Sequence, residues 1–189
     1  VDHAFQRTGF DKERLFYTQG DYGLFQSSKP AVASAGRTYD NEESIRAMLA
    51  AQGFAFAEDG ELLLPESGAP RMAIPTDLIP YCPHDGAEMT TNLRADERFV
   101  EDAGWHAAAG RYTDYLAQTE GRGTLLIELG VGMNTPGIIK YPFWRMTAER
   151  ADVTFATVNL GMGYIPPEIA PRSMIINGDI AKTLRELIS

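Results

Sequence analysis

Three short, nearly continuous apolar segments mark the second half of the chain. They cover residues 124–129, 153–158 and 173–176, and glycine, asparagine or aspartate follows each of them closely. Apolar residues without alternation are typical of strands covered on both faces of a sheet, and the small polar residues behind them indicate turns. We therefore predict three buried strands that each end in a turn.

Helical patterns separate these strands or follow them, over residues 103–118, 145–150 and 179–188. In the last of them, Asp179 is placed to cap the helix, and apolar residues recur on one face. The order of strand, turn, helix and strand predicts an α/β fold with a partial Rossmann-like, doubly wound parallel sheet. Three strands are few for such a sheet, so we expect its remaining strands to lie upstream of this chain.

The first half of the chain follows another pattern. Residues 41–52 form a short amphipathic helix pattern with Asn41 as its cap, and residues 53–83 are rich in prolines and turns. This composition predicts a small irregular subdomain inserted into the sheet domain. The expected division is a cofactor-site segment over 1–24, the inserted subdomain over 25–100, and the C-terminal half of the Rossmann-like domain over 101–189.

Charge and cysteine content narrow the class of protein. The 189 residues carry a formal net charge of -9 and a single cysteine. An acidic chain is a poor partner for nucleic acid or for an anionic membrane, and the sequence has no apolar run of the roughly 20 residues that span a bilayer. One cysteine cannot form an intrachain disulfide and fits a reducing compartment, so we expect a cytoplasmic protein.

The opening of the chain carries the first functional motif. Val1-Asp2-His3 is followed by Gln19-Gly20 and then by Asp21-Tyr22-Gly23. This resembles the sirtuin pattern in which Asn-Ile-Asp precedes a His-Gly pair, with the triplet's asparagine expected just before Val1 and Gln19 at the histidine's place. The resemblance implies that Val1 and Asp2 contact the nicotinamide of NAD, that Gln19 faces its ribose, and that the phosphate loop and the N-terminal half of the catalytic core lie outside this chain.

Gln19 changes the chemistry that this resemblance implies. An imidazole can take up a proton near neutral pH, whereas a primary amide only forms hydrogen bonds. Cleavage of the nicotinamide bond needs positioning and charge stabilisation, but acyl transfer gains from a base. Segment 16–26 is similar to the macrodomain-linked (class M) sirtuins, a branch associated with protein ADP-ribosylation. The alternative interpretation is that Gln19 only caps a turn before Gly20.

The predicted strand ends carry the second group of candidate residues. Segment 126–136 resembles the family's strand, glycine turn and proline, Asn159 occupies its Ile-Asn step, and segment 178–180 resembles its last turn beside adenine. Glycines behind a parallel strand let backbone N–H groups approach phosphate and ribose oxygens. The resemblance implies the following cofactor-binding residues: Gly130, Gly132, Asn134, Asn159, Asp179 and Ile180.

A zinc ribbon is a regular part of sirtuins, but its cysteine pairs are missing here. The resemblance places the first pair at Ser27 and Ala31 and the second at Cys82 and Asp85. One thiolate does not make a four-ligand structural zinc site, so we expect no metal. The subdomain is instead expected to be held by apolar packing around Phe25, Ile79, Tyr81 and Met89. A metal site made of Cys82, His84 and Asp85 is the alternative.

Substrate-side residues follow from position alone. Residues 94–102 occupy the place of the family's acyl-lysine-binding strand but differ from it in sequence. Phe99, Val100 and Trp105 are the candidates for contact with a protein substrate, and a core or lid role is the alternative for the aromatic pair. His3 and His106 are expected to be surface or turn residues.

Taken together, the resemblance implies an NAD-dependent protein ADP-ribosyltransferase of sirtuin type, with catalytic Gln19 and Asp2. An NAD-dependent protein deacylase acting on acyl-lysine is the alternative within enzymes. A non-catalytic module that binds NAD or ADP-ribose is the alternative from another class. The expected partners are a protein substrate and the N-terminal half of the same catalytic core.

Overall fold

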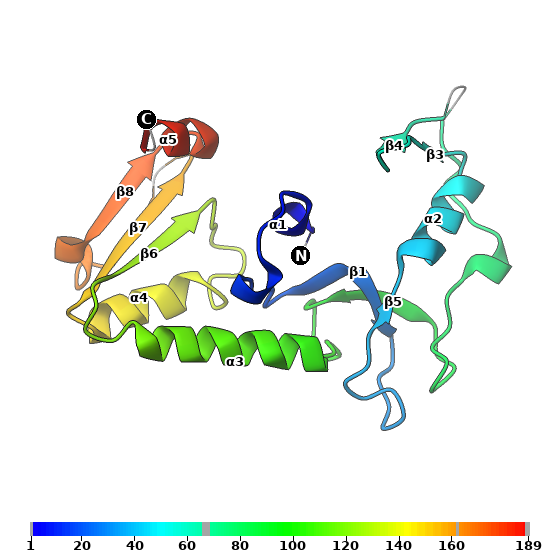
Figure 1. The fold of residues 1–189 in the computed structure, drawn as a ribbon, viewed down its shortest axis with the longest axis horizontal. Coiled ribbons are helices and arrows are strands. Elements are labelled where there is room, and N and C mark those ends of the chain that lie inside the picture. The colour runs from blue at the N-terminus through cyan, green and yellow to red at the C-terminus, as the bar shows by residue number, and fades with distance from the viewer. Residues whose placement is uncertain (1, 66–68, 162, 188–189) are drawn as a thin grey trace. The chain divides into compact units, whose positions relative to one another are not determined.

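The computed structural model of the chain describes residues 2–65, 69–161 and 163–187. It is an α/β protein that divides into two compact units, Val1–Tyr112 and Thr113–Ser189. Figure 1 shows the helices and strands of both. The predicted three-part division of the chain stays a prediction beside these two units.

The first unit is built on a small antiparallel sheet in the order β2-β1-β5. Its elements are α1 (Ala4–Arg7), β1 (Gly20–Ser27), β2 (Tyr39–Asp40), α2 (Glu42–Ala51), β3 (Ala55–Phe56), β4 (Leu62–Leu63), β5 (Met89–Leu93) and most of α3 (Ala103–Gln118), with short 3₁₀ turns at Lys12–Arg14 and Thr76–Leu78. β3 and β4 form a separate antiparallel pair. The predicted inserted subdomain, residues 25–100, lies within this unit, and its boundaries stay a prediction.

A buried amide pair fixes the loop that follows β5. Asn92 Nδ2 donates to Gln26 Oε1 at 2.8 Å, and both side chains are buried. Gln26 Oε1 also accepts from the Val100 N–H at 3.0 Å, and Gln26 Nε2 donates to the Arg98 carbonyl at 2.8 Å. Buried amides with satisfied donors and acceptors hold a backbone in one arrangement. Loop 94–102 is therefore tied to β1 and β5 at two points.

The second unit contains the parallel sheet that the sequence predicts, in the order β6-β7-β8. Its elements are β6 (Thr124–Leu129), α4 (Lys140–Glu149), β7 (Val153–Asn159), a 3₁₀ turn (Ala170–Arg172), β8 (Ser173–Asn177) and α5 (Ile180–Leu187). Leu126 pairs with Phe155, and Val158 with Ile176, in one continuous parallel register. The three arrows in Figure 1 point to the end of the sheet at which α5 lies. The predicted positions of these strands and of α3 are confirmed, but β8 is not buried, since Met174 and Ile175 are 52% and 44% exposed.

One face of this sheet carries the core of the unit. Leu126, Val153, Phe155 and Ile169 are buried together, and the aromatic and apolar residues of α4 pack against them. α4 begins at Lys140 rather than at the predicted residue 145, because Pro142 is tolerated in the first turn of a helix, where its missing N–H has no intrahelical partner.

On the opposite face of β6, apolar side chains are exposed in the part of the chain that the structure describes. Leu125, Ile127 and Leu129 are 54%, 46% and 44% exposed. The prediction that this strand is covered on both faces is therefore wrong for the described chain. Parallel sheets are almost always covered on both sides, so these three residues form an uncovered apolar face.

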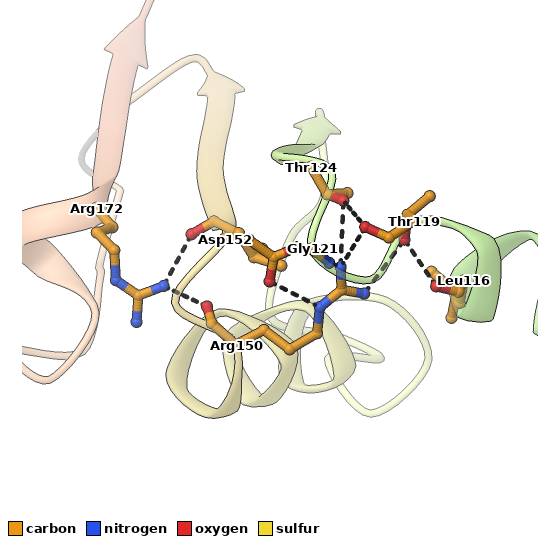
Figure 2. Close-up of polar contacts among 8 residues, drawn as sticks. Leu116, Thr119, Gly121, Thr124, Arg150, Asp152 and Arg172 are labelled. Atoms are coloured by element: carbon orange, nitrogen blue, oxygen red, sulfur yellow. Dashed lines mark hydrogen bonds and ion pairs between the residues drawn. The ribbon is translucent and has the colours of Figure 1, made fainter.

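Two arginines of the second unit, Arg150 and Arg172, form hydrogen bonds near the starts of β6 and β7 (Figure 2). Arg150 donates to Asp152 Oδ2 at 2.7 Å and to the Thr119 carbonyl at 2.8 Å, and Asp152 accepts the Gly121 N–H at 3.0 Å. Arg172 donates to the Val153 carbonyl at 2.9 Å. These bonds satisfy backbone groups that turns leave unpaired, so they hold the starts of β6 and β7 in place.

Two details of the helices differ from prediction. Asn41 precedes α2, but its buried side chain donates to the Tyr22 carbonyl at 2.8 Å and does not cap the helix. The stripe predicted on the last helix is mostly exposed, with Leu184 at 37% and Leu187 at 68%, while Ile188 lies outside the described residues.

Candidate functional site

Gln19 directly precedes β1, and the next residue, Gly20, has a backbone conformation that favours glycine. The Gln19 carbonyl accepts the Arg94 N–H at 3.0 Å, and the Gln19 side chain is half-buried. Gly20 has φ of +97°, and a Cβ there would lie 2.2 Å from the Asn92 carbonyl oxygen. Any side chain at Gly20 would push the two strands apart, so the Gln19-Gly20 pair is fixed by backbone geometry.

Arg94 gathers the substrate-side candidates beside Gln19. Its guanidinium carbon lies 4.2 Å from the centre of the Phe99 ring and 5.3 Å from that of Trp105. Arg94 Nε donates to the Thr18 carbonyl at 3.1 Å. Its Nη2 pairs with Glu101 at 2.6 Å. Arg94 was not among the residues predicted from the sequence, although a cation in an acidic run near two aromatic residues was a usable signal.

The other substrate-side candidate lies differently. Val100 is 6% exposed, and its N–H and carbonyl both bond to the buried amide pair of Gln26 and Asn92. Its side chain therefore faces the interior of the unit. The role of Val100 in substrate contact stays a prediction, as do those of Phe99 and Trp105.

Asp2 is exposed at the start of the described chain, and Val1, the other opening candidate, lies outside the described residues. Asp2 Oδ1 accepts the Ala4 N–H at 3.1 Å. This hydrogen bond lowers the pKa of Asp2 below its ordinary value, because it favours the ionised carboxylate. The carboxylate is therefore available as an acceptor for an amide such as that of nicotinamide.

His3 lies in a bend before α1, in line with the expectation of a surface or turn residue, but its imidazole also has a buried partner. Its Nε2 contacts Oδ1 of Asp21, a carboxylate that is only 7% exposed, while the imidazole is 39% exposed. The two residues are 18 positions apart, so the pairing follows from the fold of α1 against β1 and not from local pattern.

The first unit also contains an open cavity of about 1070 Å³. Its apolar wall consists of Tyr22, Ile45, Leu49, Phe56 and Leu62. Its charged and polar rim consists of His3, Arg7, Asp40, Asn41, Glu42, Arg46, Asp59 and Glu61. The rim contains four carboxylates against two arginines, of which Arg46 is already paired with Glu42 at 3.0 Å.

In the second unit, the carboxyl ends of the three parallel strands bring several predicted cofactor-binding residues to one edge. The Gly130 N–H donates to the Val158 carbonyl at 2.9 Å, and the Gly178 N–H donates to the Asn159 carbonyl at 3.1 Å. Gly130 has φ of +68°, and a Cβ there would lie 3.2 Å from Cδ1 of Ile180. A side chain at position 130 would press against Ile180, so glycine allows the close approach of these two residues.

The last turn of this edge is capped by Asp179. Its Oδ1 accepts the Lys182 N–H at 2.8 Å, at the start of α5. The N-terminus of a helix carries partial positive charge, which favours oxygen-rich ligands such as ribose and phosphate groups. Gly132 and Asn134 lie in the exposed loop behind β6. Their role in cofactor binding stays a prediction.

A buried ion pair lies directly before this edge and was missed from the sequence. Glu128 on β6 and Lys140 at the start of α4 are 2.5 Å apart, with side chains 0% and 8% exposed. The sign that could have revealed it is a carboxylate inside an apolar strand, because such a group is rarely buried without a cation. Glu128 Oε1 is buried with no hydrogen-bond partner among the described residues.

The positions that the resemblance gives to the zinc ribbon contain a polar cluster around Cys82 and Asp85. The Ser34 hydroxyl and the Ala87 N–H lower the pKa of Asp85 to about 2. Cys82 Sγ lies 3.3 Å from the Tyr39 hydroxyl, and burial raises the pKa of Tyr39 to about 12. The Ser27 hydroxyl, at one of the places that the resemblance gives to the missing first cysteine pair, also lowers the pKa of Asp85.

The expected packing is also only partly present. Phe25 is buried, but Tyr81 is 51% exposed and cannot be a core anchor. Among the described residues, no group of three or more histidine, cysteine, aspartate or glutamate side chains is arranged to hold a metal ion. None of the described helices is long and apolar enough to cross a membrane.

Comparison with known proteins gives the coarse class. A Staphylococcus aureus (strain Mu50 / ATCC 700699) protein named "Protein ADP-ribosyltransferase" is 35% identical over 182 residues, covering 96% of this chain and 51% of that protein. A Fusarium oxysporum f. sp. cubense protein named "Probable bifunctional ADP-ribose hydrolase/ADP-ribosyltransferase" is 26% identical over 212 residues, covering 100% of this chain and 30% of that protein. No family model matches the chain.

The chain is thus similar to proteins named as ADP-ribosyltransferases, and it spans about half the length of the first relative and less of the second.

Proposed function

We propose that this chain supplies part of the catalytic core of a sirtuin-type, NAD-dependent protein ADP-ribosyltransferase. The observation that carries the proposal is the edge formed by the carboxyl ends of three adjacent parallel strands, where Gly130 directly follows β6, Asn159 is the last residue of β7 and Asp179 lies in the turn after β8. Nucleotides bind at this end of open α/β sheets. The 35% identity with a protein named as an ADP-ribosyltransferase supports the same choice.

The residues fit an adenosine half of NAD at this edge. Gly130 carries no side chain of its own at the end of β6, and Asn159 offers an amide at the end of β7. An amide can both donate to and accept from ribose hydroxyls. Asp179 and Ile180 begin α5 and would flank adenine with one polar and one apolar group.

The opening residues are assigned to the nicotinamide half. Asp2 would accept from the nicotinamide amide, and Gln19 would hydrogen-bond a ribose hydroxyl and hold the glycosidic bond in a reactive pose. NAD supplies the ADP-ribose and nicotinamide as leaving group. Arg94 lies beside the Gln19 backbone and offers a cation whose direction is fixed by Glu101.

The uncovered face of β6 supports a larger core. Leu125, Ile127 and Leu129 expose apolar area, and β6 has one neighbouring strand among the described residues. Covering such a face would contribute about 25 cal/mol for each Å² removed from water. We therefore propose that the rest of the catalytic core packs on this face, and that the acceptor of ADP-ribose is a protein.

The test follows NAD labelled on its adenylate phosphate in the full-length natural protein. Transfer of the label to protein, independent of any acyl-lysine, is the expected result. Gln19→Ala should lower this transfer at least tenfold, because the ribose is no longer held. Gln118→Ala, at the exposed end of α3, is the matched control and should transfer at the wild-type rate.

Other outcomes would replace the proposal. Label released only as O-acyl-ADP-ribose, and only with acylated peptide, would mean that the protein is a deacylase. Saturable NAD binding without nicotinamide release would mean a binding module. Wild-type transfer in Gln19→Ala would remove Gln19 from the mechanism.

A further inference from the structure

A histidine and a buried carboxylate form a pair beside Gln19 that the proposed mechanism has not used. Asp21 lies two residues after Gln19 on β1, and its side chain is 7% exposed. Its Oδ1 accepts the Gly23 N–H at 2.8 Å and contacts His3 Nε2. A carboxylate removed from water needs such partners, and an imidazole N–H is one that can also become a cation.

Gly23 makes this pairing sterically possible. A Cβ at position 23 would lie 2.4 Å from Cε1 and 2.9 Å from Nε2 of His3. Both distances are shorter than any real contact of a Cβ atom, so a side chain here would displace the imidazole. The glycine is therefore needed for the approach of His3, since its own φ lies outside the left-handed region.

The backbone of His3 is itself held in an uncommon conformation. Its φ of 60° and ψ of 12° are left-handed, and it is the only non-glycine residue with positive φ in the described ranges. Such a conformation is unfavourable for a residue with a side chain, persists where the surroundings determine it, and is frequent at functional sites. In this conformation His3 precedes α1, its carbonyl accepts the Arg7 N–H at 2.9 Å, and its imidazole contacts Asp21.

The imidazole also faces free space. His3 lines the cavity of about 1070 Å³, next to Tyr22 and Gly23. When Nε2–H donates to Asp21, Nδ1 keeps the lone pair of the ring, and no other hydrogen bond of this ring occurs among the described residues. A carboxylate that orients an imidazole whose second nitrogen is free is the arrangement of a general base.

We infer that His3 is the general base of the transfer reaction, oriented by Asp21, and that the acceptor side chain of the protein substrate enters through this cavity. The inference rests on the proposed function. It gives the chain a base that Gln19 cannot be. In the step, the bond from ribose C1′ to nicotinamide breaks and a bond from C1′ to the acceptor forms. The acceptor's proton passes to His3 Nδ1, the Asp21 carboxylate stabilises the imidazolium, and the proton then leaves to solvent.

The rim of the cavity indicates the kind of acceptor segment. Asp40, Asp59 and Glu61 make no ion pair among the described residues, whereas Arg46 is paired. The other charged groups that face the space around His3 are Arg7, Glu42 and Arg46. An excess of unpaired carboxylates above an apolar wall fits a protein segment that combines basic and apolar side chains.

The experiment compares transfer of adenylate label in full-length wild type, His3→Gln and His3→Ala across pH. We expect a fall of at least tenfold in transfer rate in both variants, with NAD affinity unchanged, and loss of the rising limb of the pH profile. Added imidazole should partly restore His3→Ala, which a purely structural role would not allow. His106→Gln, a 63% exposed histidine, is the matched control.

A second measurement tests the pair without activity. Imidazole ¹⁵N spectra should show His3 protonated at Nε2, and Asp21→Asn should shift that resonance. A His3 resonance that ignores Asp21→Asn, or full transfer in His3→Gln, would overturn the inference while leaving the proposed function standing. Wild-type protein that releases no nicotinamide would remove the proposed function and this assignment together.

Discussion

Two carboxylates on strands, Asp21 on β1 and Glu128 on β6, are almost completely buried, but their partners differ. The partner of Glu128 is a lysine with 8% exposure at the start of α4. The partner of Asp21 is an imidazole with 39% exposure that lines a cavity. Both acids break the rule that charges stay in water, and both do so with a cationic or potentially cationic neighbour.

The difference separates a structural pair from a candidate catalytic one. The side chains of Glu128 and Lys140 are 0% and 8% exposed, so a substrate does not contact them. The pair therefore stabilises the packing of α4 against β6. The Asp21–His3 pair has one buried end and one open end, and only such a pair can pass a proton to or from a ligand. Burial of a carboxylate by itself therefore does not distinguish a structural pair from a candidate catalytic pair. The exposed fraction of its partner distinguishes them.

The largest expected effect on stability comes from breaking the buried Glu128–Lys140 pair. Lys140→Met should lower the free energy of unfolding by about 3–5 kcal/mol, because Glu128 then stays buried without a cation. Urea unfolding followed by circular dichroism measures it. The double variant Glu128→Leu with Lys140→Met should recover most of the loss, since two apolar groups of similar size replace the pair. A single variant as stable as wild type would contradict the comparison.

The partly exposed His3–Asp21 pair should be sensitive to a single methyl group added at position 23. Gly23→Ala places a Cβ 2.4 Å from His3 Cε1, so the imidazole leaves Asp21. We expect a loss of about 1–3 kcal/mol in the free energy of unfolding, because a buried carboxylate loses one partner. Transfer activity should fall as in His3→Gln.

The matched control for that change is Gly110→Ala. Nothing lies within 4 Å of a Cβ at this helical glycine of α3. It should stabilise the protein by about 0.5–1 kcal/mol, since alanine is the better helix former. Equal effects of the two substitutions would show that His3 does not depend on Gly23.

The smallest expected effect on stability concerns a third acid, Asp85, whose neighbouring donors are neutral rather than cationic. Asp85 Oδ1 accepts the Ala87 N–H at 2.9 Å, and the neighbouring Ser34 hydroxyl and this N–H lower the pKa of Asp85 from 3.8 to about 2. A lowered folded pKa stabilises the fold above pH about 4, and this contribution is lost as the pH falls through 2. Wild type should therefore exceed Asp85→Asn in stability near neutral pH and match it below pH about 2.

Unfolding midpoints in urea across this pH range measure the effect. Asp114→Asn, an exposed acid on α3, should show no such convergence. A constant difference between wild type and Asp85→Asn down to the lowest pH would contradict the role of the ionised carboxylate.

The local pattern of the sequence determined the elements of the second unit. The apolar runs behind β6, β7 and β8, and the helical period of α3, were enough to place those elements, because strands and helices follow from side-chain spacing and turn residues. The same pattern located Gly130, Asn159 and Asp179 at strand ends, and parallel order then predicts that they meet at one edge. The predicted cofactor and substrate roles stay predictions.

Only the tertiary structure decided which polar groups find one another. His3 and Asp21 are 18 residues apart, Glu128 and Lys140 are 12 apart, and Gln26 and Asn92 are 66 apart. Asn41 turned from a predicted helix cap into a bridge to Tyr22 for the same reason. A strand pattern tells which residues are apolar, but the partner of a buried polar group depends on which elements pack together. The free energy that forces such pairing arises from removing these groups from water, and it acts only once the fold has closed around them.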